Sequence, residues 1–172
     1  MSRITILGLF AAAFGCLAGC DKKPAPSTEF KGGHDHSDHD RKDAQIEDIK
    51  LPGGEYHAGL TAHLSEKADK NELDVFFETH DKKAFPIPLT AKVTARVTRP
   101  GDDKAYDLEF KPAEKDERKN DPADKCSRFS ADAPWMKPED KLSVVLTVEI
   151  DKKIHRCTFV DFNPKKFAHA HE

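Results

Sequence analysis

Residues 142–150 read Leu-Ser-Val-Val-Leu-Thr-Val-Glu-Ile, and this stretch decides the fold class. Apolar residues occupy every second position, at Leu142, Val144, Leu146, Val148 and Ile150. Because successive side chains of a β-strand point to opposite faces, this spacing places all five on one face. Valine, isoleucine and threonine fill more than half of the stretch and favour extended backbone. The stretch therefore predicts a long strand with one face in a hydrophobic core.

The same alternation recurs on both sides of this strand. It is found in residues 56–64, 73–77, 89–97, 106–110, 127–131 and 154–162, with a shorter piece at 49–51 before Pro52-Gly53-Gly54. A helical turn is expected only at 133–140, between prolines. Short alternating segments separated by turn residues are typical of an antiparallel β-sandwich. We expect an all-β sandwich of about seven strands, with immunoglobulin-like topology, and an edge position for the segment of Pro86 and Pro88.

Composition and charge restrict the function. The chain has 172 residues, a formal net charge of −3 and 34% charged residues, with the two signs interleaved. This pattern gives no basic face for a nucleic acid. No nucleophile elbow, zinc-protease helix, phosphate-binding glycine loop or kinase motif is present in the sequence. We therefore expect a protein that is not an enzyme and does not bind nucleic acid.

The N-terminal residues predict export. Arg3 precedes an apolar run, Ile4 to Leu17, that is too short to span a bilayer as a helix, and Leu17-Ala18-Gly19-Cys20 resembles the lipobox of bacterial lipoproteins. We expect residues 1–19 to be a signal peptide and Cys20 to carry a diacylglycerol that anchors the protein to a membrane. The alternative is an ordinary secretory signal with a chance cysteine. The expected location is the cell envelope, facing the periplasm, on an inner or outer membrane.

Four segments follow from these patterns: the signal peptide at 1–19, a disordered tether at 20–48, a β-sandwich domain at 49–163 and a C-terminal tail at 164–172. The tether contains Gly-Gly-His-Asp-His-Ser-Asp-His-Asp at residues 32–40. Neutral imidazole suits zinc or copper, and carboxylates complete such shells. The predicted metal ligands of the tether are His34, Asp35, His36 and His39. The alternative is a solvated spacer without a ligand.

Other histidines are weaker candidates. His169 and His171 near the C-terminus repeat the ligand type and could share an ion with the tether, or could lie on an unrelated frayed end. His57 and His63 are six strand residues apart, roughly 20 Å, which is too far for a shared ion. We expect both to lie on the solvent face, with a lone surface ligand near a hairpin start as the alternative for His57. We expect His80 to be a polar residue of a turn.

Cys126 and Cys157 are the two thiols expected to remain after lipidation and removal of the signal peptide. An oxidising compartment and two predicted strands favour a disulfide between them. The alternative is a soft metal site, because His155 and Cys157 share a strand face and Cys126 could complete a three-ligand set.

These features together resemble a family. With its lipobox, its His/Asp-rich leader and the segments Glu55–Leu60 and Lys83–Leu89, the chain resembles small lipoproteins of planctomycete-like bacteria, and its leader resembles segments of heavy-metal efflux adaptors. The resemblance implies an envelope location and metal handling. The expected function is binding or buffering of zinc or copper through the tether, with transfer to a metal-transport partner. The alternative is an envelope protein-interaction module whose tether is only a spacer.

Overall fold

The computed structural model describes residues 44–169. The described chain consists of β-strands, turns and one short 3₁₀ helix, η1 (Ala68–Lys70). The strands are β1 (Gln45–Leu51), β2 (Gly54–His63), β3 (Glu72–Glu78), β4 (Ile87–Pro88), β5 (Lys92–Thr98), β6 (Ala105–Pro112), β7 (Lys125–Cys126), β8 (Arg128–Asp132), β9 (Leu142–Ile150), β10 (Lys153–Phe162) and β11 (Ala168–His169). The all-β prediction is confirmed.

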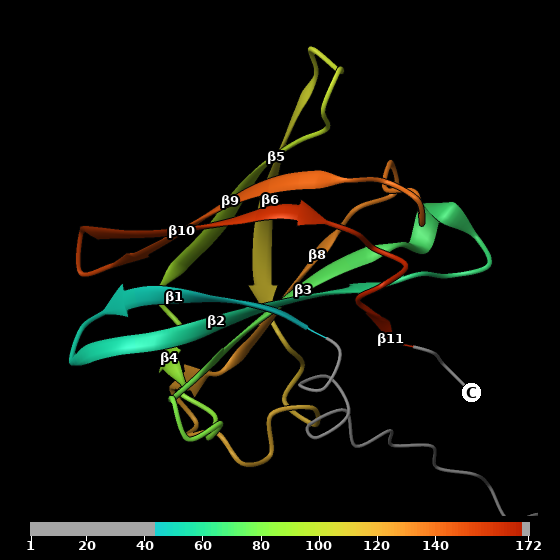
Figure 1. Ribbon diagram of the computed structural model, residues 1–172. Helices are drawn as coiled ribbons and strands as arrows, with labels where there is room; N and C mark the ends of the chain where they lie inside the picture. The colour runs from blue at the N-terminus through green and yellow to red at the C-terminus, as the bar shows by residue number, and fades with distance from the viewer. Residues whose placement is uncertain (1–43, 170–172) are drawn as a thin grey trace, which may run out of the picture. The chain divides into compact units, whose positions relative to one another are not determined.

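One long antiparallel sheet curls until its two edge strands approach each other. Its order is β1-β2-β3-β8-β6-β5-β9-β10, and β11 pairs in parallel with β2 (Figure 1). β1 and β10 are the edges, and a side-chain hydrogen bond links them where Gln45 Nε2 donates to the Val160 carbonyl at 3.1 Å. β4 and β7 form a separate two-stranded sheet, so Pro88 lies on an edge strand. The immunoglobulin-like topology is not confirmed by this strand order and stays a prediction.

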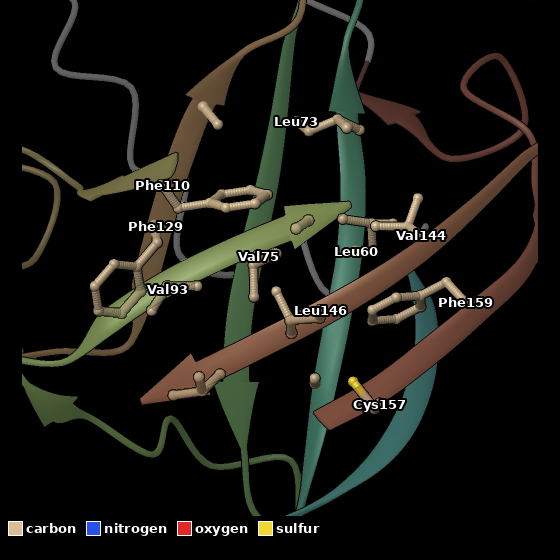
Figure 2. Close-up of a cluster of buried hydrophobic side chains, with 14 of the residues drawn as sticks. Leu60, Leu73, Val75, Val93, Phe110, Phe129, Val144, Leu146, Cys157 and Phe159 are labelled. Atoms are coloured by element: carbon tan, nitrogen blue, oxygen red, sulfur yellow. The ribbon is translucent and has the colours of Figure 1, made fainter. Parts of the chain in front are cut away.

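The core lies inside the curled sheet, and β9, the strand next to the edge strand β10, contributes a fully apolar face to it. β9 pairs with β5 on one side and β10 on the other, which places Ala95, Leu146 and Cys157 in one row. The alternation expected for residues 142–150 is confirmed, because all five apolar residues are buried. Figure 2 shows side chains from β2, β3, β5, β9 and β10 converging on this interior. A hydrophobic face on nearly every strand thus produces one shared core.

β1 and β2 form a hairpin that matters for the functional site. Pro52 and Gly53 make the two-residue turn, and Gly53 has a φ of 102°, a conformation that L side chains rarely adopt. Only Ile49 and Leu51 of β1 are buried. The strand begins at Gln45, within the segment expected to be tether. Its remaining residues are polar or exposed, as is typical of an edge strand, and so carry little apolar signal.

The segment at 133–140 is held by turns in place of the expected helical turn. Met136 N–H donates to the Ala133 carbonyl at 2.9 Å, and Asn71 Nδ2 donates to the Met136 carbonyl at 2.9 Å. Trp135 stacks on Tyr106 with ring centroids 3.9 Å apart. The segment therefore covers one side of the core without forming a helix.

The structure corrects the predicted disulfide, because Cys126 and Cys157 are both free and buried. Cys126 lies on β7 in the small sheet, and its thiol donates to the Arg128 carbonyl at 2.7 Å. Cys157 lies on β10 and points into the main core (Figure 2). The two residues belong to different sheets, and no bond joins their sulfur atoms. The alternative site of His155, Cys157 and Cys126 does not assemble among the described residues either.

Burial makes both thiols unreactive. It raises the pKa of Cys157 to about 12 and also raises the pKa of Cys126. Since the thiolate is the reactive species, we expect neither cysteine to react with iodoacetamide at pH 8 in the folded protein, and both to react in denaturant without reductant. Peptide mass mapping measures this. A Cys126–Cys157 linked peptide, two hydrogens lighter than the free pair, would contradict it.

Several predicted features lie outside residues 44–169. These are the signal peptide, the lipidation site Cys20, the ligands His34, Asp35, His36 and His39 of the tether, and His171. Within the described residues, no helix has the length and apolar character needed to cross a membrane.

Candidate metal centre

Three side chains that are far apart in the sequence meet on the outer side of β1 and β2. They are Asp48, His57 and His80, and one potential ligand atom from each lies within 4.8 Å of the other two. His57 Nε2 is 2.9 Å from His80 Nδ1 and 3.3 Å from Asp48 Oδ1. The two imidazole rings are nearly perpendicular, at 88°. Among the described residues, this is the one cluster of histidine, cysteine and acidic side chains with such spacing.

Strand register places two of the three ligands. The Pro52-Gly53 turn pairs Leu51 with Gly54, and the same register places Asp48 directly opposite His57. Side chains of directly opposed residues on neighbouring strands lie on the same face of a sheet. Asp48 and His57 therefore meet because the hairpin has a two-residue turn.

The third ligand comes from the turn after β3. Lys82 N–H donates to the Thr79 carbonyl, and Thr79 N–H donates to the Lys83 carbonyl, both at 2.8 Å. Lys82 has a φ of 59°, which closes this tight turn. The turn presents His80 beside His57, whose partner in the β2–β3 register is Glu78. A short, internally hydrogen-bonded turn thus holds the second imidazole.

Glu78 lies behind His57, on the side of the ring away from the cluster. Its side chain is only 4% exposed, and Glu78 Oε1 is 3.8 Å from His57 Nδ1. Glu78 Oε2 is buried without a hydrogen-bond partner. A carboxylate behind a histidine orients the ring and favours the tautomer whose other nitrogen is open to a ligand. A distance of 3.8 Å is too long for a hydrogen bond, so a small ring movement toward Glu78 would complete this arrangement.

Two of the three distances between ligand atoms are close to those of a metal shell, and the third is below 4.8 Å. Tetrahedral zinc with bonds of about 2.0–2.1 Å separates its ligand atoms by roughly 3.3 Å. The observed distances from His57 Nε2 are 2.9 and 3.3 Å. Asp48 and His80 are exposed and can adjust, whereas His57 is half-buried. Two imidazoles and one carboxylate suit zinc, copper(II), nickel or cobalt and leave a fourth position for another ligand.

Two other histidines considered in the sequence, His63 and His169, lie outside this cluster. His63 Nε2 is 3.4 Å from Asp74 Oδ2, so it lies in a separate polar group on the same sheet face as His57. His169 was expected on a frayed C-terminal end. Its backbone instead pairs with that of His63, as part of β11.

Sequence reasoning missed the centre because it treated His57 and His80 as unrelated surface residues. One signal was available: Pro52-Gly53 as a two-residue turn places Asp48 opposite His57. No comparable signal connects His80 to them, because the irregular loop between β2 and β3 does not allow the pairing of these two strands to be predicted from the sequence. Comparisons of the chain with known protein families, curated proteins and solved structures find no match.

Replacing Glu78 with glutamine tests the supporting carboxylate. Loss of an outer-shell carboxylate weakens metal binding by about 10–100-fold in known sites, and we expect a decrease of this size for zinc. Glutamine keeps the side-chain volume, so the free energy of unfolding in the absence of metal should not decrease. Zinc titration by calorimetry measures the first effect and urea denaturation the second. Unchanged zinc affinity would show that Glu78 does not support His57.

Proposed function

We propose that this protein binds a divalent transition-metal ion through Asp48, His57 and His80 and carries it as exchangeable cargo. The single observation that supports this function best is the convergence of three ligand atoms within 4.8 Å, with the buried Glu78 behind the central histidine. Asp48 and His80 are exposed, so an ion could enter and leave without unfolding of the core. An exposed site with an open coordination position suits transfer better than permanent structural binding.

The N-terminal segments extend this proposal. His34, His36 and His39 would capture metal at the membrane surface, and Cys20 would anchor the protein there through its lipid. The last histidine of the predicted tether, His39, precedes Asp48 by nine residues in the sequence. A segment rich in ligands that is joined by the chain to the centre would raise the local metal concentration at that centre.

Zinc titration calorimetry of three variants tests the proposal. The His57→Ala/His80→Ala double variant removes both nitrogen ligands of the centre, the His34→Ala/His36→Ala/His39→Ala variant removes those of the tether, and His63→Gln is a control on the same strand. We expect the double variant to lose one zinc equivalent, because removing two of the three ligands should weaken binding by more than the roughly 10–100-fold caused by loss of an outer-shell partner. We expect the tether variant to retain that equivalent.

Each outcome has a distinct meaning. Equal zinc binding by the wild type and the double variant would exclude the centre. Loss of all binding in the tether variant alone would assign the metal to the tether. Binding should also weaken as the pH falls, because protons compete with the metal for imidazole nitrogen. No zinc binding by the wild type would favour the alternative function, a protein-interaction module.

A further inference from the structure

A groove adjoins the metal centre where β1 and β10 approach but do not pair. Its volume is about 470 Å³, and it is lined by Asp48, Ile49 and Lys50 of β1, by Glu55 of β2 and by Ile154, His155 and Arg156 of β10. Among the described strands, no backbone ladder joins β1 to β10. The open seam of the curled sheet therefore leaves room for a small ligand.

Asp48 belongs to both the groove and the metal centre. Asp48 Oδ1 is one of the three clustered ligand atoms, and the same residue lines the groove. A molecule in the groove would thus lie beside a bound ion. Since the protein offers three ligands, the fourth position of a tetrahedral ion is available to such a molecule.

The charges around the groove favour an anion once metal is bound. Lys50 Nζ and Glu55 Oε1 are 3.1 Å apart and neutralise each other. The carboxylates of Asp48 and Glu78 together match the two charges of the ion. Arg156 forms no ion pair within residues 44–169. The residue opposite it on β9 is Thr147, and the residue opposite Thr147 on β5 is Thr94, so neither neighbour in this row is charged. No residue in the described part of the chain therefore supplies a counterion to its guanidinium.

Two further features define the class of anion. His155 Nε2 is buried and has no hydrogen-bond partner, so a polar ligand in the groove would gain a partner there. Ile154 is 57% exposed at the rim and offers an apolar contact. A guanidinium binds a planar carboxylate with two parallel hydrogen bonds, and a carboxylate oxygen is also a good ligand for a divalent transition metal.

We propose that this groove binds a small organic carboxylate, which pairs with Arg156 and occupies the open position of the metal ion. The carboxylate arrives with the metal or joins it at the site, and its release frees the ion for transfer. This inference rests on the proposed metal binding. It adds the chemical class of a second ligand and assigns a role to Arg156.

Cobalt(II) makes this second ligand visible, because its absorption spectrum changes with its coordination shell. The protein is loaded with one equivalent of cobalt and titrated with sodium benzoate, with sodium sulfate at the same ionic strength as a parallel titration. We expect benzoate, and not sulfate, to change the visible spectrum with saturation. Arg156→Ala should weaken benzoate binding by roughly 10–100-fold, the contribution of a charge-assisted pair. Arg96→Ala removes an exposed arginine of β5 and should have no effect.

The outcomes separate the two proposals. Failure of the wild type to bind cobalt would overturn the metal centre itself. Cobalt binding with an unchanged spectrum in benzoate would overturn the groove ligand and leave the metal centre intact. An equal response to sulfate would overturn the assignment to carboxylates. Equal benzoate affinity of the Arg156→Ala and Arg96→Ala variants would overturn the role of Arg156.

Discussion

Replacing Leu146 with alanine should lower the free energy of unfolding by about 2–5 kcal/mol. Leu146 has no exposed surface and lies on β9, which pairs with β5 on one side and β10 on the other. Its neighbours in the register, Ala95 and Cys157, are both small. They cannot fill the space that a shortened side chain would leave, so both transfer energy and packing are lost. Urea denaturation, followed by circular dichroism, measures this change.

Ile154→Ala is the matched control for this substitution. Ile154 is also a large aliphatic residue of the same sheet, on the adjacent strand β10, but 57% of its surface is exposed. We expect its replacement to change the free energy of unfolding by no more than about 0.5 kcal/mol. Equal effects of the two substitutions would show that the interior of the curled sheet is not the core that stabilises the fold.

Replacing Arg99 with leucine should cost about 3 kcal/mol, because it leaves the nearly buried Asp140 carboxylate without its counterion. Arg99 Nε and Nη2 donate to the two oxygens of Asp140 at 2.9 and 2.7 Å. Asp140 is 8% exposed, and it also accepts the Lys137 N–H at 2.9 Å. The Arg99–Asp140 ion pair links the end of β5 to the turns that precede β9. Chemical denaturation at pH 7 tests the prediction.

The same strand provides a control for Arg99. Arg96 Nη1 is 3.3 Å from Asp107 Oδ1, but both side chains are more than half exposed. Exposed pairs of this kind contribute about 0–1 kcal/mol, so Arg96→Leu should have little effect. In the Arg99→Leu background, Asp140→Asn should recover part of the loss by removing the unpaired charge. If Arg99→Leu were no more costly than Arg96→Leu, burial of Asp140 would not be the cause.

The strands were predictable wherever one face is buried and the other is solvated. β9 has the expected bounds, and β10 begins one residue before the expected start. β1 was predicted only as the short stub 49–51 because it is an edge strand, whose exposed residues carry no apolar pattern. Its residues 45–48 were assigned to the tether. Such a strand is identified by its partner, and pairing is not visible in composition.

The disulfide prediction was wrong for a related reason. The prediction rested on two thiols in predicted strands and an oxidising compartment, without knowledge of which strands pair. Cys126 instead lies in the two-stranded sheet with β4, and Cys157 lies at the edge of the main sheet. Alternation shows which way a side chain points across a strand and carries no information about which strand lies opposite.

One part of the metal centre could be predicted from the sequence and another part could not. The two-residue turn at Pro52-Gly53 already implies that Asp48 faces His57. The approach of His80 depends on the irregular loop before β3 and on the turn after it. Ligand types could therefore be recognised in the sequence, whereas their meeting point depends on the register of three strands and one turn.

Hydrophobic alternation and turn residues were sufficient to specify an all-β chain and most of its strands, because both depend on neighbours in the sequence. Strand order, the open seam between β1 and β10, the free thiols and the Asp48–His57–His80 cluster required the folded chain. The physical reason is that they depend on contacts between segments far apart in sequence. Such contacts follow from how the strand faces pack together, and no single strand encodes them.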